Sequence, residues 1–175
     1  MTVSIDTMTL IWGVQGFGAK SGNLRQPDLK EKQFRARVLL ELLEDRKEEI
    51  VIASVVVSEF LIGVPSARHK DFLAAIDKRF RVHPFDLPAC ALAASLWLQH
   101  KKHPPAGQAD RTCLKADMLI VATAKLAGSA VFYTNDANCR NLASLANMRA
   151  EDLPTKHPEM FRNNDLRKEM NLPPL

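Results

Sequence analysis

The sequence predicts an α/β protein in which a central parallel sheet of four to five strands is covered by helices on both faces. Short β-branched, apolar segments alternate with longer segments in which apolar residues recur every three or four positions. Strands that alternate with helices are typical of a parallel sheet with helical crossovers. The 175 residues contain no internal repeat, and the length suits a single core. We therefore expect one domain at 1–153, followed by a polar, proline-bearing tail at 154–175 that packs on the domain or trails from it.

Five segments have the character of strands. The segment at 50–57 is continuously apolar and β-branched, which is typical of a strand buried on both faces. The last of the five is less apolar and is expected at an edge of the sheet. The predicted strands lie at 3–6, 50–57, 82–85, 130–134 and 148–153.

The helices are predicted from a repeat of apolar residues opposite charged ones. A long helix contains Phe34, Val38 and Leu42 at intervals of four residues, and it follows a glycine- and proline-bearing loop at 19–28. A helix that begins at Ser58 is broken by Pro65. Further helices are expected at 66–80, 88–101, 114–127 and 138–147.

Composition narrows the class of protein. Hydrophobic residues make up 46% and charged residues 25%, as in an ordinary globular protein. No apolar run reaches the length of a membrane span, and the N-terminus lacks a basic leader, so a cytoplasmic protein is expected. The three cysteines have no paired spacing and are expected to be reduced. The formal net charge of +4 favours a phosphate-rich partner without proving one.

Four acidic residues stand apart from the others because they lie in apolar stretches rather than on charged helix faces. Each is expected at the end of a strand or at the start of a helix, and Asp117 is expected to open its helix. In parallel sheets, ligands bind outside the carboxyl ends of the strands. The four residues are Asp6, Glu59, Asp117 and Asp136.

A shared divalent cation explains how four carboxylates can lie close together despite their mutual repulsion. A carboxylate buried among apolar groups is unfavourable by several kcal/mol unless it is paired or coordinates a metal. Carboxylates are the ligands that Mg²⁺ prefers, and the absence of His or Cys at comparable positions argues against zinc. A single acid at the start of a helix often only caps that helix, and Asp136 also fits a turn. The hypothesis therefore depends on all four residues together.

The four isolated acids lie in the segments SIDTMTLIW, VVVSEF, KADMLIVATAKLAG and FYTNDANCRNLA. These segments resemble the acidic motifs of PIN-domain nucleases, and within that family the chain is most similar to the VapC-like toxins of toxin–antitoxin pairs. The resemblance covers about the first six-sevenths of the chain.

The resemblance implies a three-layer α/β/α fold and an endoribonuclease that uses Mg²⁺ or Mn²⁺. It carries metal binding and catalysis onto the four acids, and it gives Thr134 and Asn135 a supporting role beside the last acid. Two positions depart from the family pattern. Met8 stands where Asn or Ser is common, and Asn138 stands where a further acid is common, so Asn138 brings an oxygen but no charge. The resemblance also implies an RNA substrate, a homodimer, and an antitoxin whose tail blocks the pocket.

Contacts with RNA are expected from basic clusters, although such clusters are often only solvated helix faces. The cluster at 100–103 is favoured because it precedes the loop that leads to Asp117. The cluster at 68–70 is a second candidate, and the cluster at 78–81 is a third. The candidate RNA-binding residues are Lys101, Lys102, Arg68 and Lys70.

Other interpretations of the function fit the residues less well. The segment GVQGFGAKS nearly matches a phosphate-binding P-loop, but Ala19 separates the last glycine from Lys20. His100 and His103 have a spacing that suits a metal, but they are expected at an exposed helix end. Met8 lies where a haloacid-dehalogenase-like phosphatase needs a second aspartate. The main alternative is a catalytically idle PIN-like module that binds RNA or a protein.

Overall fold

The computed structural model describes residues 1–14, 26–102 and 111–154. Most of the expected loop at 19–28, most of the P-loop-like segment, His103 and nearly all of the tail at 154–175 lie outside the described residues. Within the described part, five parallel strands form one sheet in the order β3-β2-β1-β4-β5. The strands are β1 (Thr2–Ile5), β2 (Glu49–Ala53), β3 (Arg81–His83), β4 (Val131–Tyr133) and β5 (Arg149–Glu151).

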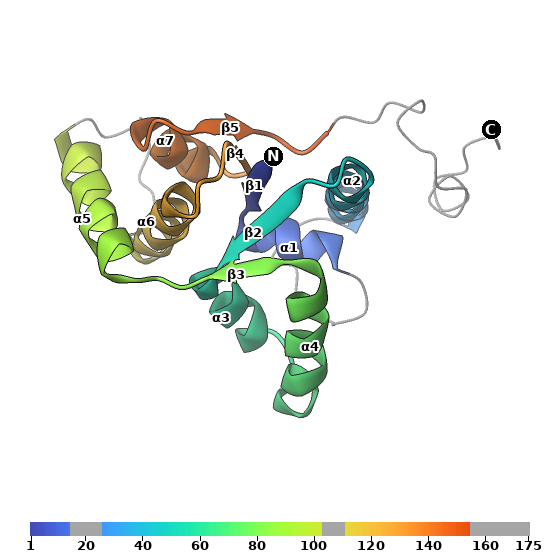
Figure 1. The fold of residues 1–175 in the computed structure, drawn as a ribbon. Coiled ribbons are helices and arrows are strands. Elements are labelled where there is room, and N and C mark those ends of the chain that lie inside the picture. The colour runs from blue at the N-terminus through green and yellow to red at the C-terminus, as the bar shows by residue number, and fades with distance from the viewer. Residues whose placement is uncertain (15–25, 103–110, 155–175) are drawn as a thin grey trace.

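Helices cover both faces of this sheet. Figure 1 shows α5, α6 and α7 on one side of the strands and α1, α2 and α4 on the other. The described helices are α1 (Thr7–Gly13), α2 (Gln26–Asp45), α3 (Ser54–Ile62), α4 (His69–Arg79) with the short 3₁₀ helix η1 (Ser66–Arg68) before it, α5 (Leu87–Lys102), α6 (Arg111–Leu126) and α7 (Ala137–Leu145). The predicted parallel sheet with helices on both faces is therefore confirmed. Among the described helices, none combines the length and the apolar character that a membrane span needs.

The central strand β1 sets the position of the carboxyl edge. Ile5 pairs with Tyr133 of β4, so the residues that follow these two strands, Asp6 and Thr134, emerge side by side. Side chains at the middle of the sheet, including Val3 and Phe132, are completely buried. Because the core holds these strands in register, the two polar residues have fixed positions at its edge.

The prediction of a strand at 50–57 is wrong for its second half. β2 ends at Ala53, and α3 begins at Ser54, so the β-branched valines that follow are helical. Valine is disfavoured in a helix by less than about 1 kcal/mol, whereas burial of its side chain contributes about 1.5–3 kcal/mol. Val56 and Val57 are both buried, so tertiary packing outweighs their local preference.

Two predicted helix boundaries are also wrong. α6 begins at Arg111, so Asp117 lies inside the helix and does not open it. α2 begins at Gln26, so the last residues of the expected loop are helical. Pro27 is compatible with this start because a helix tolerates proline in its first turn. The helix end predicted at Gly128 is consistent with the structure, where this glycine has a left-handed φ of 79°.

Candidate metal centre

Asp6 begins the site, at the junction between β1 and α1. Its side chain is 4% exposed, and it caps α1, because its Oδ1 accepts a hydrogen bond from the backbone N–H of Thr9 at 2.7 Å. Its Oδ2 accepts a hydrogen bond from the Thr134 hydroxyl at 2.5 Å. Burial raises the pKa of Asp6 above its usual value, and the bonds from Thr134 and Thr9 oppose that rise.

Thr134 joins Asp6 to Asp136. Its hydroxyl oxygen accepts the backbone N–H of Asp136 at 2.9 Å while donating to Asp6. Asp136 caps α7, since its Oδ1 accepts the N–H groups of Asn138 at 2.6 Å and Cys139 at 3.1 Å. Within the described residues, no donor contacts its Oδ2, and the side chain is exposed. Asp6 and Asp136 therefore both act as helix caps, as the alternative interpretation expected. Each carboxylate still retains lone pairs for a further ligand.

Asp117 reaches the same place from the interior of α6. Oxygen atoms of Asp117 and Asp136 and the Sγ of Cys139 all lie within 4.8 Å of one another. Burial raises the pKa of Asp117 to about 6, and the Cys139 thiol opposes this by donating a hydrogen bond to the carboxylate. The negative charges of the other three acids raise that pKa further. Burial likewise raises the pKa of the Cys139 thiol, so this sulfur is held in its neutral form.

Glu59 joins the group from α3. Its Oε2 accepts a hydrogen bond from the hydroxyl of Thr7, which directly follows Asp6. Its charge is one of those that raise the pKa of Asp117. The structure therefore brings all four predicted acids to one region, from β1, α3, α6 and the loop after β4.

The residues present fit a divalent cation. Among the described residues, no lysine or arginine forms an ion pair with any of the four acids. A carboxylate has about four lone-pair positions, so even the doubly hydrogen-bonded Asp6 retains capacity for a ligand. The donors are mainly hard oxygens, as Mg²⁺ and Mn²⁺ prefer. The raised pKa of Asp117 reflects the burial and mutual repulsion that a bound cation would relieve.

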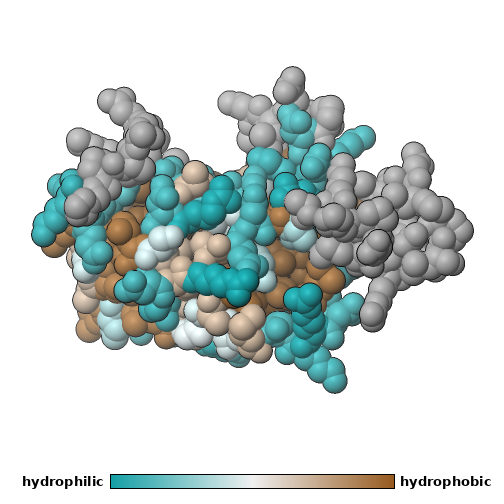
Figure 2. Space-filling model, turned by 90° about the horizontal axis from the view of Figure 1, so that it is seen from above, coloured by the Kyte–Doolittle hydropathy of each residue, from teal (hydrophilic) through white to brown (hydrophobic). Residues whose placement is uncertain are grey.

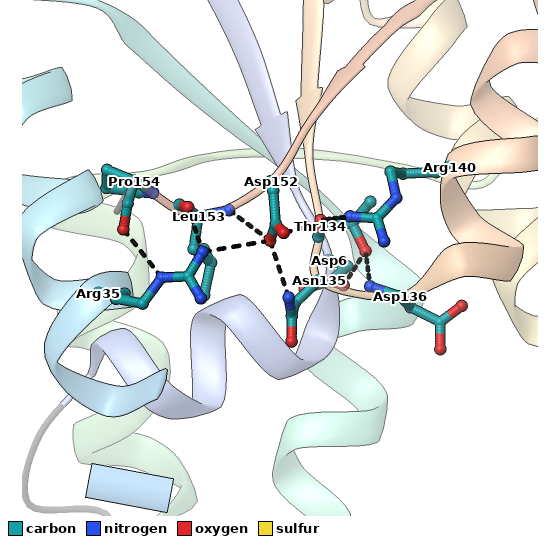
Figure 3. A network of polar contacts seen from close by, with 9 residues as sticks. All are labelled: Asp6, Arg35, Thr134, Asn135, Asp136, Arg140, Asp152, Leu153 and Pro154. Carbon is teal, nitrogen blue, oxygen red and sulfur yellow. Dashed lines mark hydrogen bonds and ion pairs between the residues drawn. The ribbon is translucent and has the colours of Figure 1, made fainter. Parts of the chain in front are cut away.

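The predicted supporting residues divide into two kinds. Thr134 is completely buried and contacts both Asp6 and Asp136. Asn135 instead directs its amide toward the end of β5, where its Nδ2 donates to Oδ1 of Asp152 at 2.8 Å (Figure 3). Asn138 contributes its backbone N–H to the cap on Asp136.

Sequence reasoning missed several residues around the acids. Thr7 and Cys139 contact Glu59 and Asp117 directly. The sequence gives one indication of these two residues, since Thr7 follows Asp6 and Cys139 lies one helical turn after Asp136.

Two further residues that sequence reasoning missed, Arg140 and Asp152, support the loop between β4 and α7 (Figure 3). No sequence signal identifies Asp152, because its role depends on β5 lying beside β4.

The predicted RNA-binding residues are exposed but fall into two separate places. Lys101 and Lys102 lie at the end of α5, where the Nζ of Lys101 is 5.0 Å from the centre of the Trp97 ring. Arg68 and Lys70 lie at η1 and the start of α4, and Figure 1 shows that this segment is far from the end of α5. Figure 2 shows hydrophilic and apolar residues interspersed on the visible face.

Comparison with known proteins agrees with this architecture. The family model described as PIN domain matches residues 28–145. The fold is similar to that of VapBC2 from Rickettsia felis bound to a promoter DNA fragment, with a TM-score of 0.59, 16% identity, and coverage of 88% of this chain and 100% of that one. It is also similar to VapBC-1 from nontypeable Haemophilus influenzae, with a TM-score of 0.56, 15% identity, and coverage of 87% and 98%.

A third similar structure is DNA-bound VapBC from Salmonella typhimurium, with a TM-score of 0.55, 21% identity, and coverage of 88% of this chain and 99% of that one. No curated protein matches the chain. At these identities the solved structures support the fold alone, whereas the family model spans more than half of the chain. The residues matched by the family model include β2 and the two helices that supply acids, α3 with Glu59 and α6 with Asp117. By this match and by its five-stranded parallel sheet, the chain belongs to the PIN domain family.

Proposed function

We propose that this chain is an endoribonuclease that uses Mg²⁺ or Mn²⁺ to hydrolyse RNA phosphodiester bonds, and that it is the toxin of a toxin–antitoxin pair. PIN domains are generally nucleases. The observation that carries the proposal is the meeting of four carboxylates, without a cationic partner among the described residues, at the carboxyl edge of the sheet. Asp6 is buried and Asp117 is partly buried, and carboxylates in such positions are unfavourable without a counter-charge.

Each acid has a proposed role in this chemistry. Asp6, Asp117 and Asp136 hold the cation, directly or through water. Glu59 holds the cation or orients the attacking water, with its carboxylate fixed by the Thr7 hydroxyl. A bound divalent cation activates water and stabilises negative charge on the reacting phosphate. Thr134 sets the separation of Asp6 and Asp136, because one hydroxyl contacts both residues.

The proposed partners follow from the same site. RNA would reach it past basic residues, for which Lys101 and Lys102 are the first candidates and Arg68 and Lys70 the second. We also propose a homodimer and a small antitoxin, a partner supported by the VapBC names of three similar structures. An arginine or lysine of such an antitoxin would pair with the unpaired acids and compete with the cation.

A cleavage assay tests the proposal. The purified chain is incubated with end-labelled single-stranded RNA in Mg²⁺, Mn²⁺ or EDTA, alongside Asp6→Asn purified identically to control for contaminating nuclease. The matched control is Asp77→Asn on α4, an exposed acid away from the site. We expect metal-dependent cleavage by the wild type and the control and none by Asp6→Asn. A folded wild type without metal-dependent cleavage would favour the idle binding module instead, and a fully active Asp6→Asn would contradict the proposed mechanism.

A further inference from the structure

A fifth carboxylate, Asp152, joins three separate segments behind the candidate metal centre. It directly follows β5, and its Oδ1 accepts the Asn135 amide at 2.8 Å and the Leu153 N–H at 2.7 Å. It also forms ion pairs with Nη2 of Arg35 on α2 and with Nη1 of Arg140 on α7, each at 3.6 Å. Figure 3 shows this carboxylate between the two guanidinium groups and the Asn135 amide.

These contacts converge on the loop that carries Thr134 and Asp136. Nη1 of Arg140 donates a hydrogen bond to the Thr134 carbonyl oxygen at 3.3 Å, and Asp152 orients the same nitrogen. Asn135, the middle residue of the loop, is held by its side chain. The loop is therefore supported from the Asp152 side through Asn135 and the Thr134 carbonyl, while the Thr134 hydroxyl faces Asp6.

The charges show that Asp152 differs from the four acids of the site. Asp152 has two cationic partners, whereas none of the four has one among the described residues. With these partners, Asp152 has no need of a metal for charge balance. Its side chain is also 46% exposed, so its contacts orient neighbouring groups without a large cost of burial.

We infer that Asp152 is a positioning residue for the metal centre: through Asn135 and Arg140 it holds Thr134 and Asp136 in the geometry that cation binding requires. This inference rests on the proposed function. Groups that orient metal ligands commonly change metal affinity by about 10–100-fold when they are removed. The competing explanation is a structural clamp, in which Asp152 only fastens β5 to α2 and α7.

Arg35 distinguishes the two explanations. Its Nε and Nη2 donate to the carbonyl oxygens of Pro154 and Leu153 at 2.8 and 2.5 Å, so it fastens the end of β5 to α2. It does not contact Asn135 or Thr134 in the described structure. The variant Arg35→Gln therefore weakens the clamp and leaves the bond between Asn135 and Asp152 in place, which makes it the matched control.

The experiment measures Mn²⁺ binding by calorimetry and melting temperature for the full chain and for Asp152→Ala, Asp152→Asn, Asn135→Ala and Arg35→Gln. We expect Asp152→Ala and Asn135→Ala each to weaken Mn²⁺ binding about tenfold or more. A double variant that combines Asp152→Ala with Asn135→Ala should bind Mn²⁺ little more weakly than either single variant, because both changes remove the same support. Asp152→Asn should recover much of the affinity, since its amide oxygen still accepts from Asn135. Arg35→Gln should lower the melting temperature with Mn²⁺ affinity unchanged.

Three results would overturn the inference. If Asp152→Ala binds Mn²⁺ as the wild type does, Asp152 is only a clamp, and the proposed function is unaffected. The same conclusion follows if Arg35→Gln weakens Mn²⁺ binding as much as Asp152→Ala does. If the folded wild type binds no Mn²⁺, the proposed function is contradicted and this inference with it.

Discussion

Thr134 donates a 2.5 Å hydrogen bond to the buried carboxylate of Asp6, although 128 positions separate the two residues in the chain. The same hydroxyl accepts the backbone N–H of Asp136. One side chain thus connects the acid after β1 to the acid after β4. The parallel pairing of these two strands makes this bond possible, because Ile5 and Tyr133 are partners in the register.

The first prediction concerns this hydroxyl. Thr134→Val keeps the side-chain shape but leaves Oδ2 of Asp6 and the N–H of Asp136 without their partner. We expect the free energy of unfolding to fall by about 1–3 kcal/mol, and RNA cleavage to fall sharply. The pKa of Asp6 should rise further, since the Thr134 bond now opposes its rise. Urea unfolding measures the change in stability, and the cleavage assay measures the change in activity. Thr134→Ser retains the hydroxyl and should behave nearly as the wild type; equal losses in the two variants would contradict the prediction.

The second prediction concerns pH in the metal-free protein. The pKa of Asp117 rises from its usual value of 3.8 to about 6 on folding, so the folded state holds this proton more tightly than the unfolded state. The resulting stabilisation is complete below about pH 4 and is lost as pH rises through about 6. In EDTA, the melting temperature should therefore fall between pH 5 and pH 7.

Glu49, whose pKa shifts in the opposite direction to that of Asp117, does not affect stability between pH 5 and pH 7. The pKa of Glu49 is lowered, first by its hydrogen bond from Arg81, so its stabilisation is lost only when the pH falls below its usual value of 4.5. Asp117→Asn should reduce the decline in melting temperature between pH 5 and pH 7, whereas Asp77→Asn should leave it unchanged. A decline of the same size in Asp117→Asn would show that another group causes it.

The third prediction concerns metal-linked stability. At pH 7.5, Mn²⁺ at one hundred times its dissociation constant should stabilise the folded chain by about 2.7 kcal/mol, because the ion binds the folded state selectively. Asp117→Asn and Asp136→Asn should lose most of this gain while remaining folded in EDTA. Thermal melting with and without Mn²⁺ measures the difference. Equal stabilisation of the wild type and both variants would place the ion elsewhere.

The fourth prediction separates the two candidate RNA-binding clusters. In the Asp6→Asn background, which keeps RNA intact, Lys101→Ala with Lys102→Ala should weaken RNA binding at low salt. Two lost phosphate contacts should reduce the slope of log affinity against log salt by about 1.4. The matched pair Arg68→Ala with Lys70→Ala tests the cluster near α4. A slope that changes only in this second pair would move the RNA path to α4, and no change in either pair would reject both clusters.

Much of the candidate site could be predicted because the four acids are conspicuous in their local sequence. Isolated charges in apolar segments mark Asp6, Glu59, Asp117 and Asp136 without any knowledge of contacts. The local setting of Asp117 was nevertheless predicted wrongly, since it lies within α6. Its side chain still reaches the site because α6 packs against α7, which carries Cys139.

The alternation of apolar periodicities by itself determined the layered α/β architecture, because each period matches one kind of element and its buried face. The isolated acids likewise determined which residues deserved attention. Only the tertiary structure decided that the helix α3 begins at Ser54, that Asn135 points to Asp152, and that Cys139 faces Asp117. These features depend on strand order, register and helix packing, which bring together residues whose separation in the chain carries no local signal.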